Sequence, residues 1–192
     1  GHEALPGGND YQELLLQLDD WPADYAPRHF SSRNVLAHIR ASIRLTADGR
    51  RVLYLDEIQS DWHADLYAQS RAAKDHGSVG ALVIPDAPFR KEWPLLSLKI
   101  MVWWAQRLRV NGLAWSTWDI QNERWGAYGP PDALYRKLLP EAAKSLSKVL
   151  NLENGVTRFR VQSLSRQVEK RGSGWIVSNP QGISITKPFS TQ

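Results

Sequence analysis

The chain has 192 residues, and none of them is cysteine. This absence excludes disulfide bonds, thiolate metal sites and a cysteine nucleophile. No apolar stretch approaches the roughly 20 residues that a membrane-spanning helix needs, and no secretory signal peptide is visible. We therefore expect no membrane association, and a reducing compartment is compatible with the composition.

Familiar active-site signatures are also missing. The sequence contains no P-loop, no dinucleotide-binding fingerprint and no recognisable Ser-His-Asp arrangement. It has no internal repeat and no low-complexity linker, so its length favours one domain. Gly1 and His2 look like a remnant of cloning or processing, and we expect residues 3–192 to form a single domain taken from a larger protein.

What the chain does have is tryptophan and a mild basic excess. Nine tryptophans are present, and we expect most of them in the core, while those beside polar motifs are suited to stacking. The net charge is +4, and the lysines and arginines are spread along the chain rather than gathered in one block. This balance permits contact with nucleic acid without requiring it.

The most informative stretch is 34–63, which predicts a long β-hairpin leading into a helix. From Val35 to Leu45 apolar and polar residues alternate with period two. Asp48 and Gly49 are typical of a two-residue hairpin turn. That turn predicts a register in which Leu45 faces Val52 and, two residues further on, Ile43 faces Tyr54 on the apolar face.

The same register predicts a polar cluster at the open end of the hairpin. It places Arg40 opposite Glu57, and it places His38 opposite Gln59.

Leu53 and Leu55 are expected on this polar face too, which implies that it is partly covered and that its polar groups need partners. One interpretation is a structural ion pair across the strands. The other is a functional site, with Asp61 and His63 following at the strand-to-helix corner, where sites often collect.

The remaining pattern predicts a mixed α/β or α+β domain with a single central, mostly antiparallel sheet flanked by helices. Residues 9–18 fit either a short helix or an edge strand, and residues 118–129 fit a loop or irregular helix. We expect helices at 62–74, 93–110 and 133–150, the last interrupted by Pro140, and strands at 113–117, 157–161, 174–177 and 182–186.

Two resemblances add to this. The runs NVLAHIR, LDEIQSDWH, APFRKEWPLLSLK and LAWSTWDIQNERW resemble an uncharacterised domain of the large polyvalent proteins of bacteriophages and mobile elements, over about residues 11–140. The resemblance implies a phage or prophage protein acting in the bacterial cytoplasm, or carried in the virion before delivery. Its neighbouring domains would counter host defences.

The order of hairpin, helix, strand and the run ALYRKLLP resembles the GNAT acetyltransferase superfamily. That resemblance implies acetyl-CoA as a cofactor, and it implies that Tyr135 reprotonates the departing thiolate. The glycine-rich loop that should bind pyrophosphate is not evident after Gln59, and 77–81 is a weak substitute.

If the chain is an enzyme, Glu57 is the candidate general base and His38 the alternative, beside Arg40 and Gln59. Candidate substrate-binding residues, apart from Asp61 and His63, are Lys91, Trp115, Thr117, Gln121 and Arg124.

A group-transfer reaction on a host or nucleic-acid target is the favoured function. A metal site has little support, because Asp61 and His63 match no familiar spacing, although magnesium on Glu57 and Asp61 beside a phosphate stays open. The alternative function is a non-catalytic module that binds nucleic acid or a host protein. The sequence does not indicate an oligomeric state.

Overall fold

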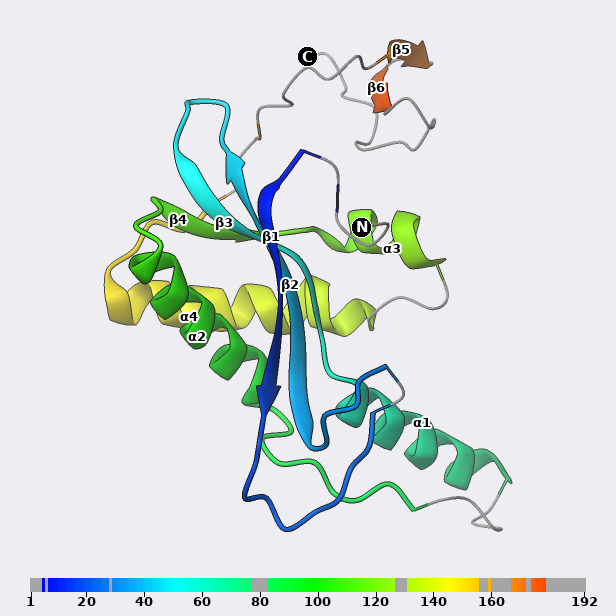
Figure 1. Ribbon diagram of the computed structural model, residues 1–192. Helices are drawn as coiled ribbons and strands as arrows, with labels where there is room; N and C mark the ends of the chain where they lie inside the picture. The colour runs from blue at the N-terminus through cyan, green and yellow to red at the C-terminus, as the bar shows by residue number, and fades with distance from the viewer. Residues whose placement is uncertain are drawn as a thin grey trace.

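The computed structural model describes residues 5, 7–27, 29–76, 83–126, 131–155 and 159, and the backbone of 167–171 and 174–178. Its main sheet has the strand order β1-β2-β3-β4 (Figure 1). The strands are β1 (Asn9–Gln17), β2 (Val35–Leu45), β3 (Arg51–Gln59) and β4 (Gly112–Trp115). β2 runs antiparallel to both of its neighbours, β1 and β3, whereas β4 runs parallel to β3.

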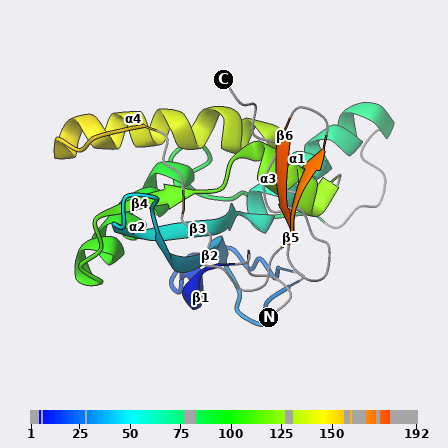
Figure 2. The same cartoon turned by 90° about the horizontal axis from the view of Figure 1, so that it is seen from above.

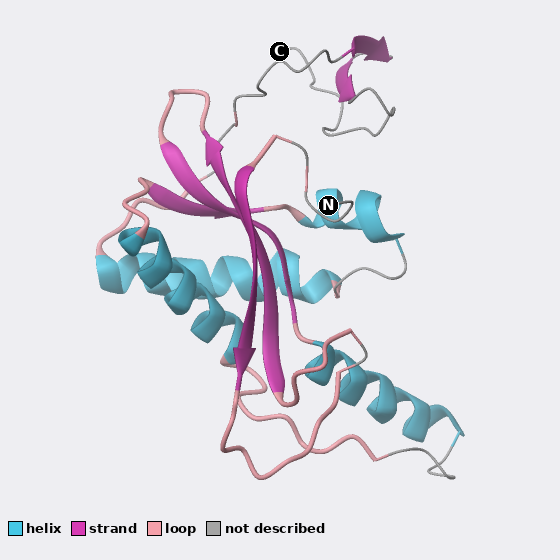
Figure 3. Ribbon diagram, in the orientation of Figure 1, coloured by secondary structure: helices cyan, strands magenta, loops and turns pink. Residues whose placement is uncertain are grey.

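Helices flank this sheet (Figure 3). They are α1 (Asp61–His76), α2 (Trp93–Arg107), α3 (Trp118–Trp125), the π-helical turn η2 (Leu134–Leu138) and α4 (Leu139–Leu150). The predicted class, a mixed α+β fold with one mostly antiparallel sheet flanked by helices, is confirmed. No helix in the described ranges is long and apolar enough to cross a membrane.

A second sheet pairs β5 (Gln167–Arg171) with β6 (Gly174–Ser178) in antiparallel fashion. The strand predicted at 174–177 is therefore confirmed, while β5 was not predicted. Of the strand predicted at 157–161 only Phe159 is described, in an isolated antiparallel bridge to Thr46. The strand predicted at 182–186 lies outside the described residues.

The core lies between one face of the main sheet and the helices α2 and α4. Figure 2 shows α4 lying along this face. Ile39, Leu55 and Ile58 of the sheet are fully buried against the helices, and Met101 is the corresponding residue of α2. Burial of such side chains contributes about 1.5–3 kcal/mol each, which makes this contact the main stabilising one.

The hairpin forms as predicted, but its turn has three residues rather than two. Thr46 pairs with Arg50, and the amide of Gly49 donates to the carbonyl of Thr46 at 2.9 Å. Gly49 adopts a φ of 88°, a left-handed conformation that glycine reaches without steric cost. The extra residue shifts the pairing by one, so that Leu45 faces Arg51 and the predicted register is wrong over 41–45.

A β-bulge at Asp56 then restores the predicted register. Beyond it Arg40 faces Glu57, His38 faces Gln59 and Ile39 faces Ile58, as expected. The bulge works because the extra residue on β3 compensates for the extra residue in the turn.

The observed register also means that the predicted faces of β3 are wrong between the turn and the bulge. Leu53 and Leu55 lie in the helix-covered core and not beside Glu57. Tyr54 instead occupies the polar face, where the guanidinium of Arg44 lies 4.5 Å from the centre of its ring.

The start of α1 is fixed by a small second core. The ring of Tyr25 stacks on Trp62 at 4.9 Å, and the indole nitrogen of Trp62 donates to the carbonyl of Pro85 at 2.8 Å. Asn34 holds the loop before β2, because its side-chain oxygen accepts from the amide of Tyr25 at 2.9 Å. This loop therefore packs against the strand-to-helix corner.

The structure decides between the alternative predictions for residues 9–18 and 118–129 and shows how the last described helix accommodates Pro140. Residues 9–17 form a strand rather than a short helix, and 118–125 form a regular helix. Pro140 does not stop the last helix: it lacks an amide proton, and the preceding turn widens to a π-helix in which the amide of Leu139 donates to the carbonyl of Leu134.

Candidate functional site

Four side chains from three strands form a continuous chain of charges on the face of the sheet opposite the core helices. We call His38, Glu13, Arg40 and Glu57 the charge chain. The Nε2 atom of His38 lies 2.7 Å from Oε1 of Glu13, and Nε of Arg40 donates to the same oxygen at 2.9 Å. Nη1 of Arg40 donates to Oε2 of Glu57 at 2.7 Å. Arg40 thus joins two carboxylates.

The charge chain is largely covered. His38 is 1% exposed and Glu57 is 3% exposed, while Glu13 reaches the surface. The ring of Phe30 packs edge-on against His38 at 4.7 Å. Burial opposes ionisation of Glu13, but hydrogen bonds from Arg40 and His38 outweigh it and lower the pKa of Glu13.

Beside the charge chain, the bulge buries a second acid. Asp56 is fully buried, and its carboxylate accepts from Oγ of Ser42 at 2.7 Å and from Nη2 of Arg44 at 2.8 Å. Burial raises the pKa of Asp56 despite the neighbouring Arg44. Its backbone carbonyl accepts from Nε2 of Gln121 at 2.6 Å and from Oγ of Ser116 at 3.2 Å, which ties α3 to β3.

Helix α3 brings Arg124 to the same region. The charges that act on Arg124 most are those of Glu57, Arg40 and Asp56, with a smaller effect from Tyr11. Burial lowers the pKa of Arg124, because desolvation penalises its charged form. The guanidinium lies 4.6 Å from the centre of the Trp125 ring, in cation–π geometry.

Tyr135 is placed by η2 at the open edge of β3. Its hydroxyl accepts from the amide of Ile58 at 2.7 Å and donates to the carbonyl of Ile58 at 3.1 Å. The side chain is 3% exposed, and burial raises the pKa of its hydroxyl. β3 extends past the end of β4, and there the Tyr135 hydroxyl bonds the backbone amide and carbonyl of Ile58 in place of a neighbouring strand. The hydroxyl that the acetyltransferase resemblance assigns to proton transfer is engaged by backbone.

Comparison of the chain with protein-family models, curated proteins and solved structures finds no match. The site must therefore be interpreted from its own geometry.

Two predicted site residues, His63 and Lys91, lie apart from the charge chain. His63 lies near Ser60, which caps α1, and near the carbonyl of Pro88, with Nδ1 2.8 Å from Ser60 Oγ and Nε2 3.1 Å from the Pro88 oxygen. Lys91 is exposed in the segment before α2. Gln59 does face His38, but its amide donates to Oδ1 of Asp61 at 3.4 Å.

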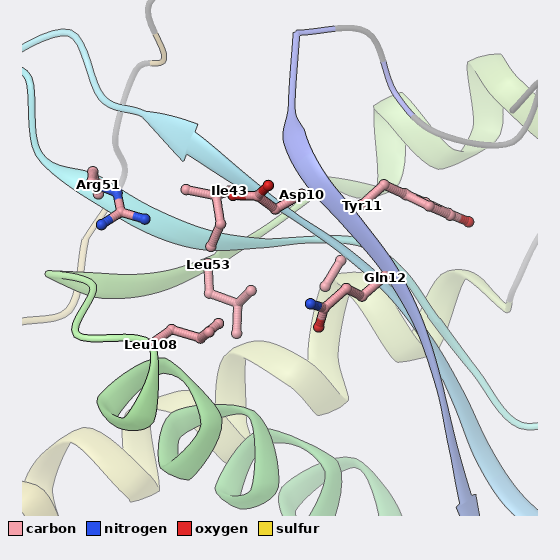
Figure 4. Close-up of a pocket in the computed structure, with 8 residues that line it drawn as sticks. Asp10, Tyr11, Gln12, Ile43, Arg51, Leu53 and Leu108 are labelled. Carbon is pink, nitrogen blue, oxygen red and sulfur yellow. The ribbon is translucent and has the colours of Figure 1, made fainter.

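Two cavities in the described part of the chain are lined by other residues than Glu57. A pocket of about 250 Å³ lies between β1 and the end of α2, lined by Gln12, Leu53 and Leu108 among others (Figure 4). Figure 4 shows Tyr11 at its rim pointing away from the two leucines. A larger groove of about 840 Å³ between α2, α4 and β4 is lined mainly by apolar side chains.

Trp115 and Thr117, predicted as substrate-binding residues, line this larger groove. The structure therefore places Trp115 and Thr117 in the groove beside α2 and α4, which Glu57 does not line. Within the described part of the chain, no three His, Asp or Glu side chains are placed to hold a metal ion.

Sequence reasoning missed Glu13 and Asp56. Glu13 was unassigned because its segment fitted either a short helix or an edge strand, whereas strand pairing places it opposite Arg40. Asp56 and Glu57 are adjacent acids inside an otherwise apolar strand. Neighbouring strand residues point to opposite faces, so two buried acids in succession on one strand were a signal for a bulge.

Proposed function

We propose that this chain is a group-transfer enzyme that moves an acyl group from a thioester donor such as acetyl-CoA to an amine or hydroxyl of a host or nucleic-acid target. The observation that supports this most is the charge chain itself. Covered charges cost stability unless they are paired, and clusters of them are concentrated at functional sites.

Glu57 is the general base of this proposal. It lies at the end of the charge chain that faces α3, whereas His38 lies at the other end against Phe30 and Glu13. Arg40 holds the Glu57 carboxylate in position by a hydrogen bond of 2.7 Å. A carboxylate fixed in this way is suited to accept a proton from a bound acceptor.

The proposed step transfers the acyl group directly from the thioester sulfur to the acceptor. The acceptor nitrogen or oxygen attacks the thioester carbonyl, the new C–N or C–O bond forms, and the C–S bond breaks. The acceptor proton passes to Glu57, and the departing thiolate takes a proton from water. Tyr135 is a positioning residue here, because its hydroxyl holds the backbone of Ile58 directly beside Glu57.

The order of elements also supports the proposal. A hairpin, helices, a parallel strand and the turn η2 bearing Tyr135, which leads into α4, follow one another in an order that resembles the GNAT superfamily. The resemblance to polyvalent phage proteins supports a target in the bacterial host. Residues 77–81, the weak substitute for a pyrophosphate loop, lie outside the described residues. Compartment and partner stay predictions.

The test is release of free CoA from acetyl-CoA, measured with a thiol-reactive chromogen. The chain itself gives no background because it has no cysteine. Acceptors are a protein lysate of the bacterial host, polyamines and DNA. We expect Glu57→Gln to lower the rate about 100-fold or more, because it removes the base but keeps the size and one hydrogen bond of the side chain.

The matched control is Glu141→Gln, which makes the same change at an exposed position of α4. It should keep the wild-type rate. The melting temperature of Glu57→Gln should stay within a few degrees of wild type. Full activity of Glu57→Gln, or a large fall in its melting temperature with a misfolded product, would favour the structural ion pair instead.

A non-catalytic binding module remains the second candidate. It is favoured by Trp21 and Phe89, which are both exposed and lie 6.4 Å apart, a geometry suited to stacking on a base or an aromatic side chain. Binding of DNA or RNA that is lost in Trp21→Ala, with no CoA release, would establish this function in place of the enzyme.

A further inference from the structure

Arg124 carries hydrogen-bond donors that the described part of the protein leaves unused. Its Nη1 and Nη2 atoms are almost completely buried, yet neither has a hydrogen-bond partner among the described residues. A buried guanidinium without acceptors is costly, so its position needs an explanation.

The nearby carboxylates are already engaged by other groups. Glu57 is bonded to Arg40, and Asp56 is bonded to Arg44 and Ser42. Glu57 and Asp56 act on Arg124 through their charge, but neither accepts a hydrogen bond from its Nη1 or Nη2 atom. Among the described residues, both terminal nitrogens of the Arg124 guanidinium are therefore still without an acceptor.

Trp125 gives the site its shape. The Arg124 guanidinium lies 4.6 Å from the centre of the indole ring, which helps to fix the guanidinium plane. The indole Nε1 atom of Trp125 is also buried without a partner among the described residues. Arginine and indole groups donate hydrogen bonds and accept none, so their ligand must present acceptors.

We propose that Arg124, with Trp125 beside it, binds an oxyanion, a carboxylate or a phosphate, carried by the substrate of the Glu57 site. Guanidinium groups bind such anions through two parallel hydrogen bonds. This inference rests on the proposed function for the role of the anion, which is to hold the substrate next to Glu57. Binding itself requires no turnover.

Isothermal titration of the whole chain with sodium phosphate and with sodium acetate, against sodium chloride of equal ionic strength, tests the proposal. We expect saturable binding that Arg124→Gln weakens about thirtyfold or more and Arg124→Lys weakens about fivefold, because lysine keeps the charge but loses the fork. Tighter binding of phosphate than acetate assigns a phosphate, and the reverse assigns a carboxylate.

Arg107→Gln is the matched control. Arg107 also lies over a tryptophan, 5.1 Å from the ring centre of Trp103, but on the exposed surface of α2. Its replacement should leave anion binding unchanged. We further expect that Arg124→Gln melts no lower than wild type when no oxyanion is present, because it removes an unpartnered buried charge.

Absence of oxyanion binding by the wild type, or equal binding by Arg124→Gln, would overturn the proposal. A lower melting temperature of Arg124→Gln without anion would overturn it too, since that result gives Arg124 a structural role. Anion binding that depends on Arg124, without CoA release, removes the enzyme but keeps this site. CoA release without such binding would keep the enzyme and remove the anion site.

Discussion

The carboxylate and the carbonyl of Asp56 connect several elements of the fold on the charged face. The carboxylate binds Ser42 and Arg44 of β2, and the carbonyl accepts from Ser116 and Gln121. One bulged residue therefore joins β2, the end of β4 and α3. The position of Arg124 next to Glu57 follows from this anchoring, because Gln121 and Arg124 lie one turn apart on α3.

His63 makes the stability of the fold depend on pH. Burial lowers the pKa of His63 from its ordinary value of 6.5, with Arg90 lowering it further and Asp86 and the Pro88 carbonyl opposing. A histidine whose pKa is depressed in the folded state binds more protons when unfolded, so stability rises with pH over this range. We predict that the free energy of unfolding falls as the pH drops below about 6.5.

Urea unfolding between pH 7.5 and 5 measures this effect. His63→Gln should give a shallower decrease than wild type, whatever its absolute stability. His29→Gln, at an exposed position in the loop before β2, should keep the wild-type slope. Equal slopes for all three proteins would mean that His63 does not cause the pH dependence.

At the scale of elements, the hairpin of β2 and β3 decides which side chains form the site. Its three-residue turn shifts the pairing by one residue, and the bulge at Asp56 shifts it back. Arg40 and Glu57 at the open end therefore face each other, as they would in a hairpin with a two-residue turn. Between Ala41 and the turn, the pairing is shifted by one residue from that of such a hairpin.

Gly49 makes this turn possible, and we predict that Gly49→Ala lowers the free energy of unfolding by about 1 kcal/mol. The reason is its φ of 88°, which an alanine adopts only with strain. Gly155→Ala is the control, because nothing lies within 4 Å of the added methyl group. Equal small effects of both changes on urea denaturation would contradict a strained turn.

Much of the fold was readable in the sequence, because period-two alternation and capping residues act locally. The hairpin and the pairing of Arg40 with Glu57 follow from such local signals. The bulge was not predicted, since it depends on how β3 meets β2 and α3. Glu13 and Tyr135 could not be assigned their contacts for the same reason, because their partners lie far away in sequence.

At the scale of the whole molecule, the two faces of the main sheet differ in character. One packs on α2 and α4 and forms the core, with the apolar groove around Trp115 at its edge. The other carries the charge chain, Asp56 and the neighbouring Arg124. Apolar burial on the first face is what lets the second hold so many charges.

The crystal structure of the protein with acetyl-CoA bound would test most directly whether the charged face is the site of chemistry. We predict that the thioester lies against Glu57, on the same face as the charge chain. A donor bound instead in the apolar groove around Trp115, with the charge chain unaltered and out of reach, would contradict this assignment.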